Sequence, residues 1–169
     1  MKIGVPKEIK PQENRIGLTP ESVKTLTSNG HEVLIENNGG FEAGFDNDQY
    51  KSAGAKIIDK AEDIFNDAEI IVKVKEPLAK EVKMIKENQI VFTYLHLAAA
   101  KELTLSLIDS KSICIAYETV TDDNGRLPLL APMSAVAGRM SIQAGARLST
   151  LINNFKMISV SFHLPINWD

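Results

Sequence analysis

Cysteine is nearly absent from the 169-residue sequence, which contains only Cys114. A single cysteine excludes an internal disulfide framework and a cysteine-based metal cluster. The three scattered histidines, His31, His96 and His163, do not make a metal site either, so no bound metal is expected. Cys114 lies in the apolar run 113–116 and is predicted to be a buried small hydrophobe.

Long apolar runs and an excess of basic charge are also missing. No stretch approaches the roughly 18 apolar residues of a membrane helix, and the start of the sequence has no apolar core of signal-peptide length. The net charge is −3, from 22 acidic and 19 basic residues, which gives no basic surface for nucleic acid or anionic lipid. We therefore expect a cytoplasmic protein with neither a nucleic-acid partner nor a membrane partner.

Three common catalytic motifs do not occur. The sequence has no Gly-x-Gly-x-x-Gly after a predicted strand, no Walker phosphate loop and no Gly-x-Ser-x-Gly elbow.

The composition changes along the chain, because no acidic residue lies between Asp123 and Asp169. Together with a turn signal at 122–125 and a proline-containing connector at 127–132, this change of composition indicates a domain boundary near 122–132.

The first 120 residues alternate short apolar runs with helical patterns. Thr19 can cap a helix that starts at Pro20 and closes at Gly30. The predicted strands are 2–5, 32–36, 69–74, 89–95 and 112–117, with a short one at 56–58; the other predicted helices are 47–53, 60–66, 82–86 and 101–110. This alternation predicts an α/β fold, an open and mostly parallel sheet with flanking helices of Rossmann-like or flavodoxin-like type. A long helix pattern follows from Met133.

Basic side chains follow two of the predicted strands, where open α/β sheets bind their ligands. Arg15, in the loop after the first strand, has the geometry to hold a small carboxylate by two parallel hydrogen bonds. The alternative is a solvated arginine paired with Glu13, which position alone favours. Lys75 leaves its predicted strand on the same side as Lys73, and it either binds an anion or extends to solvent at the sheet edge.

His96 follows the predicted strand 89–95, where an imidazole can give and take a proton near neutral pH. Taken alone, a structural histidine is the better interpretation. The functional interpretation gains from convergence, because Arg15, Lys75 and His96 leave three strands at one edge of the sheet. Together they predict a pocket with two cations for a small carboxylate and one acid/base group.

At six places the sequence closely resembles the NAD-dependent L-alanine dehydrogenases of bacteria. The matching segments are Met1–Lys10, Glu13–Arg15 with Leu18–Pro20, Lys73–Leu78, Phe92–Ala98, Ala116–Val120 and Leu129–Met140. The resemblance runs from Met1 to about Ala146. Proton-translocating transhydrogenases share this type of domain, but the segment Tyr94–Ala98 looks like the dehydrogenases.

This resemblance implies an activity and a role for each site residue. The implied reaction is the oxidative deamination of L-alanine to pyruvate and ammonia, with NAD as hydride acceptor. Arg15 and Lys75 would bind the substrate carboxylate and keto oxygen, and His96 would be the catalytic proton donor and acceptor. Met133 would pack beside the substrate, and Ser134 would contact the cofactor phosphates. Members of the family are homo-oligomers.

The resemblance also divides the chain. Residues 1–130 correspond to a substrate-binding domain and 131–146 to a helix that leads to an NAD-binding domain, whereas 147–169 resemble nothing in the family. We expect the chain to depart from the family there, through a frameshift near codons 145–150. Two further interpretations remain open: a truncated, non-catalytic product that keeps the substrate pocket or the oligomer contacts, and a small-carboxylate binding module.

Overall fold

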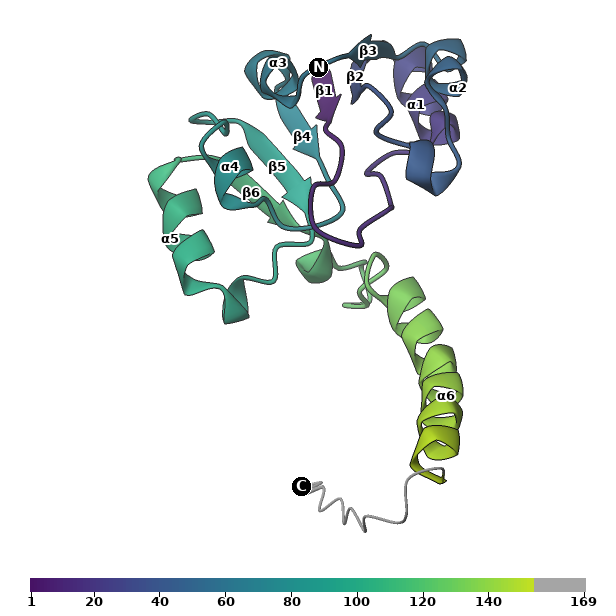
Figure 1. Cartoon of the computed structure of the whole chain (residues 1–169). Coiled ribbons are helices and arrows are strands. Elements are labelled where there is room, and N and C mark those ends of the chain that lie inside the picture. Colours follow the sequence, from purple (N-terminus) through teal and green to yellow (C-terminus); the bar gives the residue numbers. More distant parts are fainter. Residues whose placement is uncertain (154–169) are drawn as a thin grey trace. The chain divides into compact units, whose positions relative to one another are not determined.

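Alternating apolar strands and amphipathic helices form a parallel sheet with helices on both faces (Figure 1). The computed structural model describes residues 1–153. The strands are β1 (Lys2–Val5), β2 (Glu32–Glu36), β3 (Lys56–Ile58), β4 (Ile70–Val72), β5 (Ile90–Thr93) and β6 (Ile113–Ala116). The helices are α1 (Pro20–Ser28), α2 (Asn47–Ser52), α3 (Ala61–Asp67), α4 (Ala79–Val82), α5 (Lys101–Asp109) and α6 (Ala131–Asn153), with single 3₁₀ turns η1 (Phe41–Ala43), η2 (Leu97–Ala99) and η3 (Tyr117–Thr119).

The strand order is β3-β2-β1-β4-β5-β6, and every pairing is parallel. Ile3 of β1 lies between Val33 of β2 and Ile70 of β4. This is the Rossmann order of a doubly wound sheet, which resolves the choice between Rossmann-like and flavodoxin-like topology. Successive strands β2 and β3 are added on one side of β1, and β4 to β6 are added on its other side. The point between β1 and β4 is the switch point of the sheet, where ligands bind.

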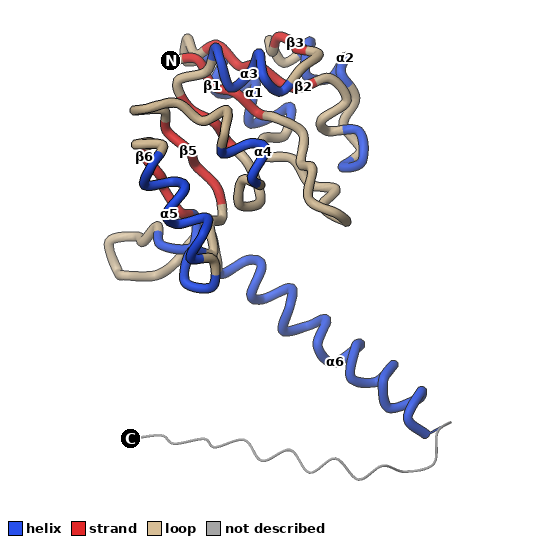
Figure 2. Tube along the Cα trace, turned by 60° about the vertical axis from the view of Figure 1, so that its left-hand side comes forward, coloured by secondary structure: helices blue, strands red, loops and turns tan. Residues whose placement is uncertain are grey.

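Each face of the sheet has its own apolar core. One core contains Val5 and Ile35 of the sheet with Val23 of α1 and Tyr50 of α2. The other face packs against α3, α4 and α5. Strand and helix alternate along the chain from β1 to β6 (Figure 2). Its buried members are Leu34, Ile64, Phe65, Ala68, Ile71, Ile85, Val91, Leu95 and Leu107.

Gly4 lets α3 pack closely against β1. A Cβ atom at this position would come within 2.5 Å of the Ile64 Cγ2 atom and 2.8 Å of the Ala68 Cβ atom. Ile64 belongs to α3 and Ala68 directly follows this helix, and both have little room to move in a packed core. Glycine is therefore required by packing here.

The local signals of the sequence explain most element boundaries. The Ser22 N–H donates to the Thr19 Oγ1 atom at the start of α1, and Gly30 has the positive φ of +81° that ends this helix. Three predicted elements inside the sheet and its helices differ clearly in extent. The strands predicted at 69–74 and 89–95 stop at Val72 and Thr93, and the helix predicted at 82–86 forms at Ala79–Val82 instead. Cys114 is half-buried rather than buried.

The described part of the chain divides into two units, 1–127 and the part from Pro128 onward. In the first unit, the edge strand β6 exposes Ile113 and Ile115. The second unit contains α6, whose side chains are exposed almost throughout residues 131–149. α6 continues through 147–153, and the rest of the predicted non-family tail lies outside the described residues. No helix within residues 1–153 is long and apolar enough to cross a membrane.

Candidate substrate site at the carboxyl edge of the sheet

Three loops at the carboxyl ends of neighbouring strands carry the predicted site residues of the first unit. Arg15 lies in the loop after β1, Lys75 follows β4 and His96 follows β5. These strands are adjacent in the sheet, in the order β1-β4-β5. The loops after β1 and β4 flank the switch point, where the divergence of the two halves leaves room for a ligand.

Arg15 is paired with Glu13 in a two-point contact. The Arg15 Nε atom donates to Glu13 Oε1 at 2.8 Å, and the Arg15 Nη2 atom donates to Glu13 Oε2 at 2.6 Å. Hydrogen bonds from Arg15 outweigh the burial of Glu13 and lower the pKa of its carboxyl group to about 2. The charge of Lys75 lowers this pKa further, which places Lys75 within electrostatic range of the pair. The pairing expected for a loop arginine is therefore present at the site.

The backbone of Lys75 is held from two sides. Its N–H donates to the Glu8 Oε1 atom at 3.2 Å, and its carbonyl accepts a hydrogen bond from the Thr93 hydroxyl of β5 at 2.9 Å. The Val74 N–H donates to the same Glu8 oxygen at 2.6 Å. One carboxylate in the β1 loop thus holds the chain that carries Lys75 beside the switch point.

Lys73 does not reach solvent. Its side chain is 1% exposed, and its Nζ atom contacts Glu8 Oε2 at 3.1 Å and Glu81 Oε1 of α4 at 2.7 Å. The other oxygen of Glu81 accepts the Leu78 N–H at the start of α4. A buried ammonium with two carboxylates satisfies the requirement that buried charges be paired. Lys73 is therefore a structural group that ties β4 to the β1 loop and to α4.

His96 is exposed and has an unusual backbone conformation. Its φ is +50° and its ψ is +37°, in the left-handed region that few residues other than glycine adopt. The His96 N–H donates to the Glu118 Oε1 atom at 2.7 Å, and the Leu95 N–H donates to the same atom at 3.0 Å. The imidazole borders a hollow of about 420 Å³ that Glu118 also lines.

An aromatic ladder supports the imidazole. The Tyr94 ring stacks on the His96 ring at a centroid distance of 6.1 Å and meets the Tyr117 ring edge-on at 4.9 Å. Tyr117 in turn meets Phe92 at 4.3 Å, and burial raises the pKa of the Tyr117 hydroxyl. Tyr94 was not predicted as a site residue. The available signal was its position directly after a buried strand, at the carboxyl end where such sheets bind ligands.

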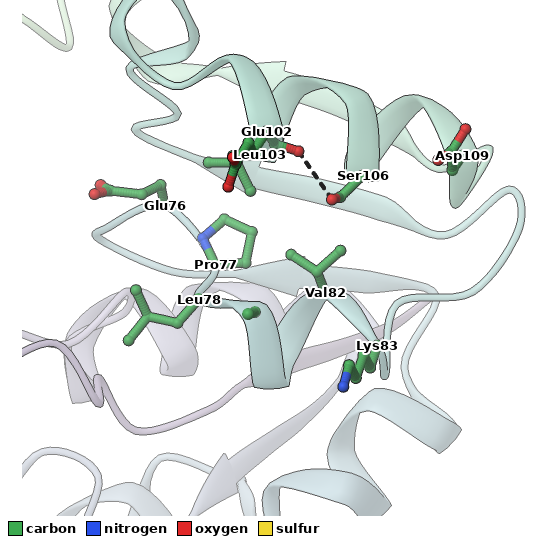
Figure 3. A pocket seen from close by; sticks show the side chains of 10 residues that line it. Glu76, Pro77, Leu78, Val82, Lys83, Glu102, Leu103, Ser106 and Asp109 are labelled. Carbon is green, nitrogen blue, oxygen red and sulfur yellow. Dashed lines mark hydrogen bonds between the residues drawn. The ribbon is translucent and has the colours of Figure 1, made fainter.

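Glu76, the residue after Lys75, lines a second hollow of about 510 Å³ between α4 and α5. Burial raises the pKa of Glu76, but a hydrogen bond from Lys10 and the charge of His96 lower it overall. Figure 3 shows Pro77 and Val82 facing Leu103 across this hollow. Its polar lining is mostly acidic, from Glu76, Glu102 and Asp109. A small carboxylate is therefore better placed at Arg15 and Lys75 than here.

Met133 and Ser134 lie in the first turns of α6, in the second unit. The first turn contains no acidic residue, which suits the approach of an anion to a helix amino-terminus. The Ser134 N–H already donates to the Leu130 carbonyl at 3.2 Å, and Pro132 has no N–H to offer. The Ser134 hydroxyl is exposed and remains a suitable donor to a phosphate.

Among residues 1–153, no group of three or more histidine, cysteine, aspartate or glutamate side chains could hold a metal ion. The described site contains two cations, one imidazole and carboxylates that hold them. Such a set recognises a small anion and moves a proton beside it.

Comparison with known proteins decides the family. The family model "Alanine dehydrogenase/PNT, N-terminal domain" matches residues 4–137. The chain belongs to the alanine dehydrogenase/PNT family. An alanine dehydrogenase of Staphylococcus epidermidis is 54% identical over 153 residues, which cover 90% of this chain and 41% of the relative. The chain thus spans about 40% of the length of the curated relatives that it matches.

Solved structures of the family agree with the sheet described above. A structure named L-alanine dehydrogenase superimposes with a TM-score of 0.82 at 54% identity, over 87% of this chain and 40% of that chain. A transhydrogenase from Sinorhizobium meliloti has a TM-score of 0.66 at 27% identity, over 70% of this chain and 35% of that chain. Within the family, the chain is thus more similar to this dehydrogenase than to this transhydrogenase.

Proposed function

We propose that this chain provides the substrate-binding domain of an L-alanine dehydrogenase, which converts L-alanine to pyruvate and ammonia with NAD. The observation that supports the proposal is the position of Arg15, Lys75 and His96 after three adjacent strands, in a chain that is 54% identical to an alanine dehydrogenase. In domain terms we propose residues 1–130 for substrate binding and 131–146 as the linking helix. The non-family tail predicted at 147–169 starts later than expected, because the match over 153 residues of this chain reaches at least residue 153.

The roles follow from the chemistry of each side chain. Arg15 forms parallel hydrogen bonds to the substrate carboxylate, and Lys75 binds the keto oxygen. His96 gives and takes the proton as water adds to the substrate imine, because an imidazole titrates near neutral pH. Met133 packs beside the substrate, and the Ser134 hydroxyl holds a cofactor phosphate. The chemistry that NAD would supply when bound is acceptance of a hydride.

A second function has its own support. Hydride transfer requires the nicotinamide to be held against the substrate, and the 169 residues contain no glycine-rich dinucleotide fingerprint. For these residues acting alone, we therefore propose binding of a small carboxylate without catalysis. We also propose a cytoplasmic location and assembly into homo-oligomers. Light scattering would test the oligomeric state. The single cysteine fits a reducing compartment.

Calorimetric titration of pyruvate into the 169-residue chain tests the site. We expect measurable binding that weakens by about tenfold or more in Arg15→Ala, because that variant leaves the Glu13 carboxylate without its cation beside the incoming anion. Arg126→Ala removes the same charge from the 122–126 turn and should bind like the parent. Absence of heat, or heat unaffected by Arg15→Ala, would contradict the site.

An activity assay separates the two functions. Incubation of the same chain with L-alanine and NAD should give no NADH if the chain only binds the carboxylate. Reduction of NAD that disappears in His96→Ala would instead establish that these residues suffice for catalysis.

A further inference from the structure

Glu118 lies one strand away from the proposed catalytic loop but contacts its backbone directly. It belongs to η3, which follows β6, whereas His96 follows β5. The two strands pair with Thr93 opposite Ala116. Glu118 lies two residues beyond this pair, and its carboxylate accepts the Leu95 and His96 N–H groups.

The backbone of His96 needs such a partner. A left-handed conformation disfavours residues with a side chain and persists only where surrounding contacts fix it. Both N–H groups at this bend donate to one carboxylate, at 3.0 and 2.7 Å, and hydrogen bonds to a charged acceptor are stronger than those between neutral groups. The His96 side chain itself is exposed, so packing alone does not hold the bend.

The loop that carries Lys75 is held in the same manner. There Glu8, from the loop after β1, accepts the N–H groups of Val74 and Lys75. In each loop the accepting carboxylate comes from the neighbouring strand of the sheet. Glu8 is also part of the buried ion cluster with Lys73, whereas Glu118 has no ion pair within 4 Å among the described residues. Glu118 therefore offers the cleaner test of a positioning role.

We propose that Glu118 is a positioning residue, which holds His96 in the left-handed conformation and so keeps the imidazole stacked on Tyr94 at the edge of the substrate site. The consequence of this placement for substrate binding rests on the proposed function. The effect of Glu118 on the backbone conformation of His96 does not rest on it. Without Glu118 the loop relaxes toward commoner conformations, and the fraction of molecules with a binding-competent imidazole falls.

Nuclear magnetic resonance of the 169-residue chain, combined with pyruvate titration, tests the proposal on Glu118→Ala and Glu118→Gln. Glu42→Gln is the control, because Glu42 is an exposed carboxylate in η1, remote in sequence from both loops. In Glu118→Ala we expect the Leu95 and His96 amide protons to move upfield and the His96 Cα shift to lose its left-handed value. A loop that is competent one-tenth of the time binds pyruvate about tenfold more weakly. Glu118→Gln, which keeps an acceptor oxygen, should lie between the parent and Glu118→Ala.

Each outcome decides the proposal. A folded Glu118→Ala variant with the parent's His96 shifts and pyruvate affinity would overturn it. If Glu118→Ala does not fold, Glu118→Gln decides, since upfield Leu95 and His96 amides support the proposal and unchanged amides refute it. If the parent chain binds no pyruvate, the proposed function fails, while the His96 shifts still show whether Glu118 fixes the backbone.

Discussion

Arg15 and Glu13 form the most direct electrostatic contact of the candidate site. Two short hydrogen bonds join them, and the Arg15 side chain remains half exposed. Because the contact fixes the plane of the guanidinium, Arg15 is oriented before any ligand arrives. The same contact makes the charge of Glu13 sensitive to the presence of Arg15.

Stability should therefore depend on pH through Glu13. Its pKa falls from 4.5 to about 2 on folding, so the pair stabilises the folded state fully above pH 4.5 and loses this effect as the pH falls toward 2. The effect is modest, because solvent screens the half-exposed arginine. Urea unfolding of the parent and Arg15→Ala should give a difference in free energy that shrinks over this interval.

Glu13→Gln provides the control for this pH dependence. In that background, Arg15→Ala should change the free energy of unfolding by the same amount at every pH between 2 and 4.5, because the titrating carboxyl is gone. A difference that shrinks equally in both backgrounds would assign the pH dependence to another group.

At the residue scale, the sequence predicts the groups that follow strands but not those that hold them. Arg15, Lys75 and His96 stand just beyond apolar runs, which a linear pattern reveals. Glu8 and Glu118 accept backbone N–H groups from other parts of the chain, at separations of 66 and 22 residues. Such contacts depend on strand order and register, which no local pattern contains.

At the scale of elements, the Lys73 cluster joins three segments that are far apart in sequence. The ammonium group lies at the exit of β4 and contacts carboxylates from the β1 loop and from α4. From the sequence, lysines at this exit were expected to meet either solvent or an anion. For Lys73 the structure gives internal anions, because Glu8 and Glu81 are buried beside it.

Removal of this ammonium should destabilise the protein strongly. Lys73→Met leaves two buried carboxylates without their cation, which costs about 3–5 kcal/mol in comparable buried pairs. Denaturant unfolding followed by circular dichroism measures the loss. Lys75→Met is the matched comparison, with a smaller loss of stability and a larger loss of pyruvate binding. Equal stability of Lys73→Met and the parent would show that the cluster contributes nothing net.

The element boundaries that sequence patterns missed have a common cause. Residues 73 and 74 were expected to extend β4, yet Val74 donates its N–H group to Glu8 instead of a neighbouring strand. The helix expected at 82–86 starts earlier, at Ala79, where the Glu81 carboxylate accepts the Leu78 N–H. In both places a buried carboxylate replaces the backbone partner that periodicity assumes.

At the scale of the whole molecule, the described chain divides at Leu127. Residues 121–126 are exposed, and their turn is closed by hydrogen bonds to the Asp122 side chain. Exposed loops between compact units are the preferred sites of proteolysis. Limited digestion with trypsin should cut first after Arg126 and leave a fragment of residues 1–126 that unfolds cooperatively.

Mass spectrometry identifies the first fragments, and Arg126→Ala should remove the first cut. Initial cleavage within residues 1–120 would contradict the division.

The edge strand β6 and its neighbour α5 also expose apolar side chains in this unit, among them Ile113, Ile115 and Ile108. Such a surface favours association with another chain, and an unprotected sheet edge favours it further.

The Glu13 carboxylate gives the site a built-in competitor. Arg15 already has a carboxylate ligand in the folded chain, so an incoming acid exchanges one such contact for another and gains little from it alone. Acetate or formate offers nothing beyond this exchange. A 2-oxo acid adds a keto oxygen for Lys75 and His96, and that second contact gives a net gain. Under the proposed function, the pair therefore makes the site select 2-oxo acids over the plain carboxylates that surround them in a cell.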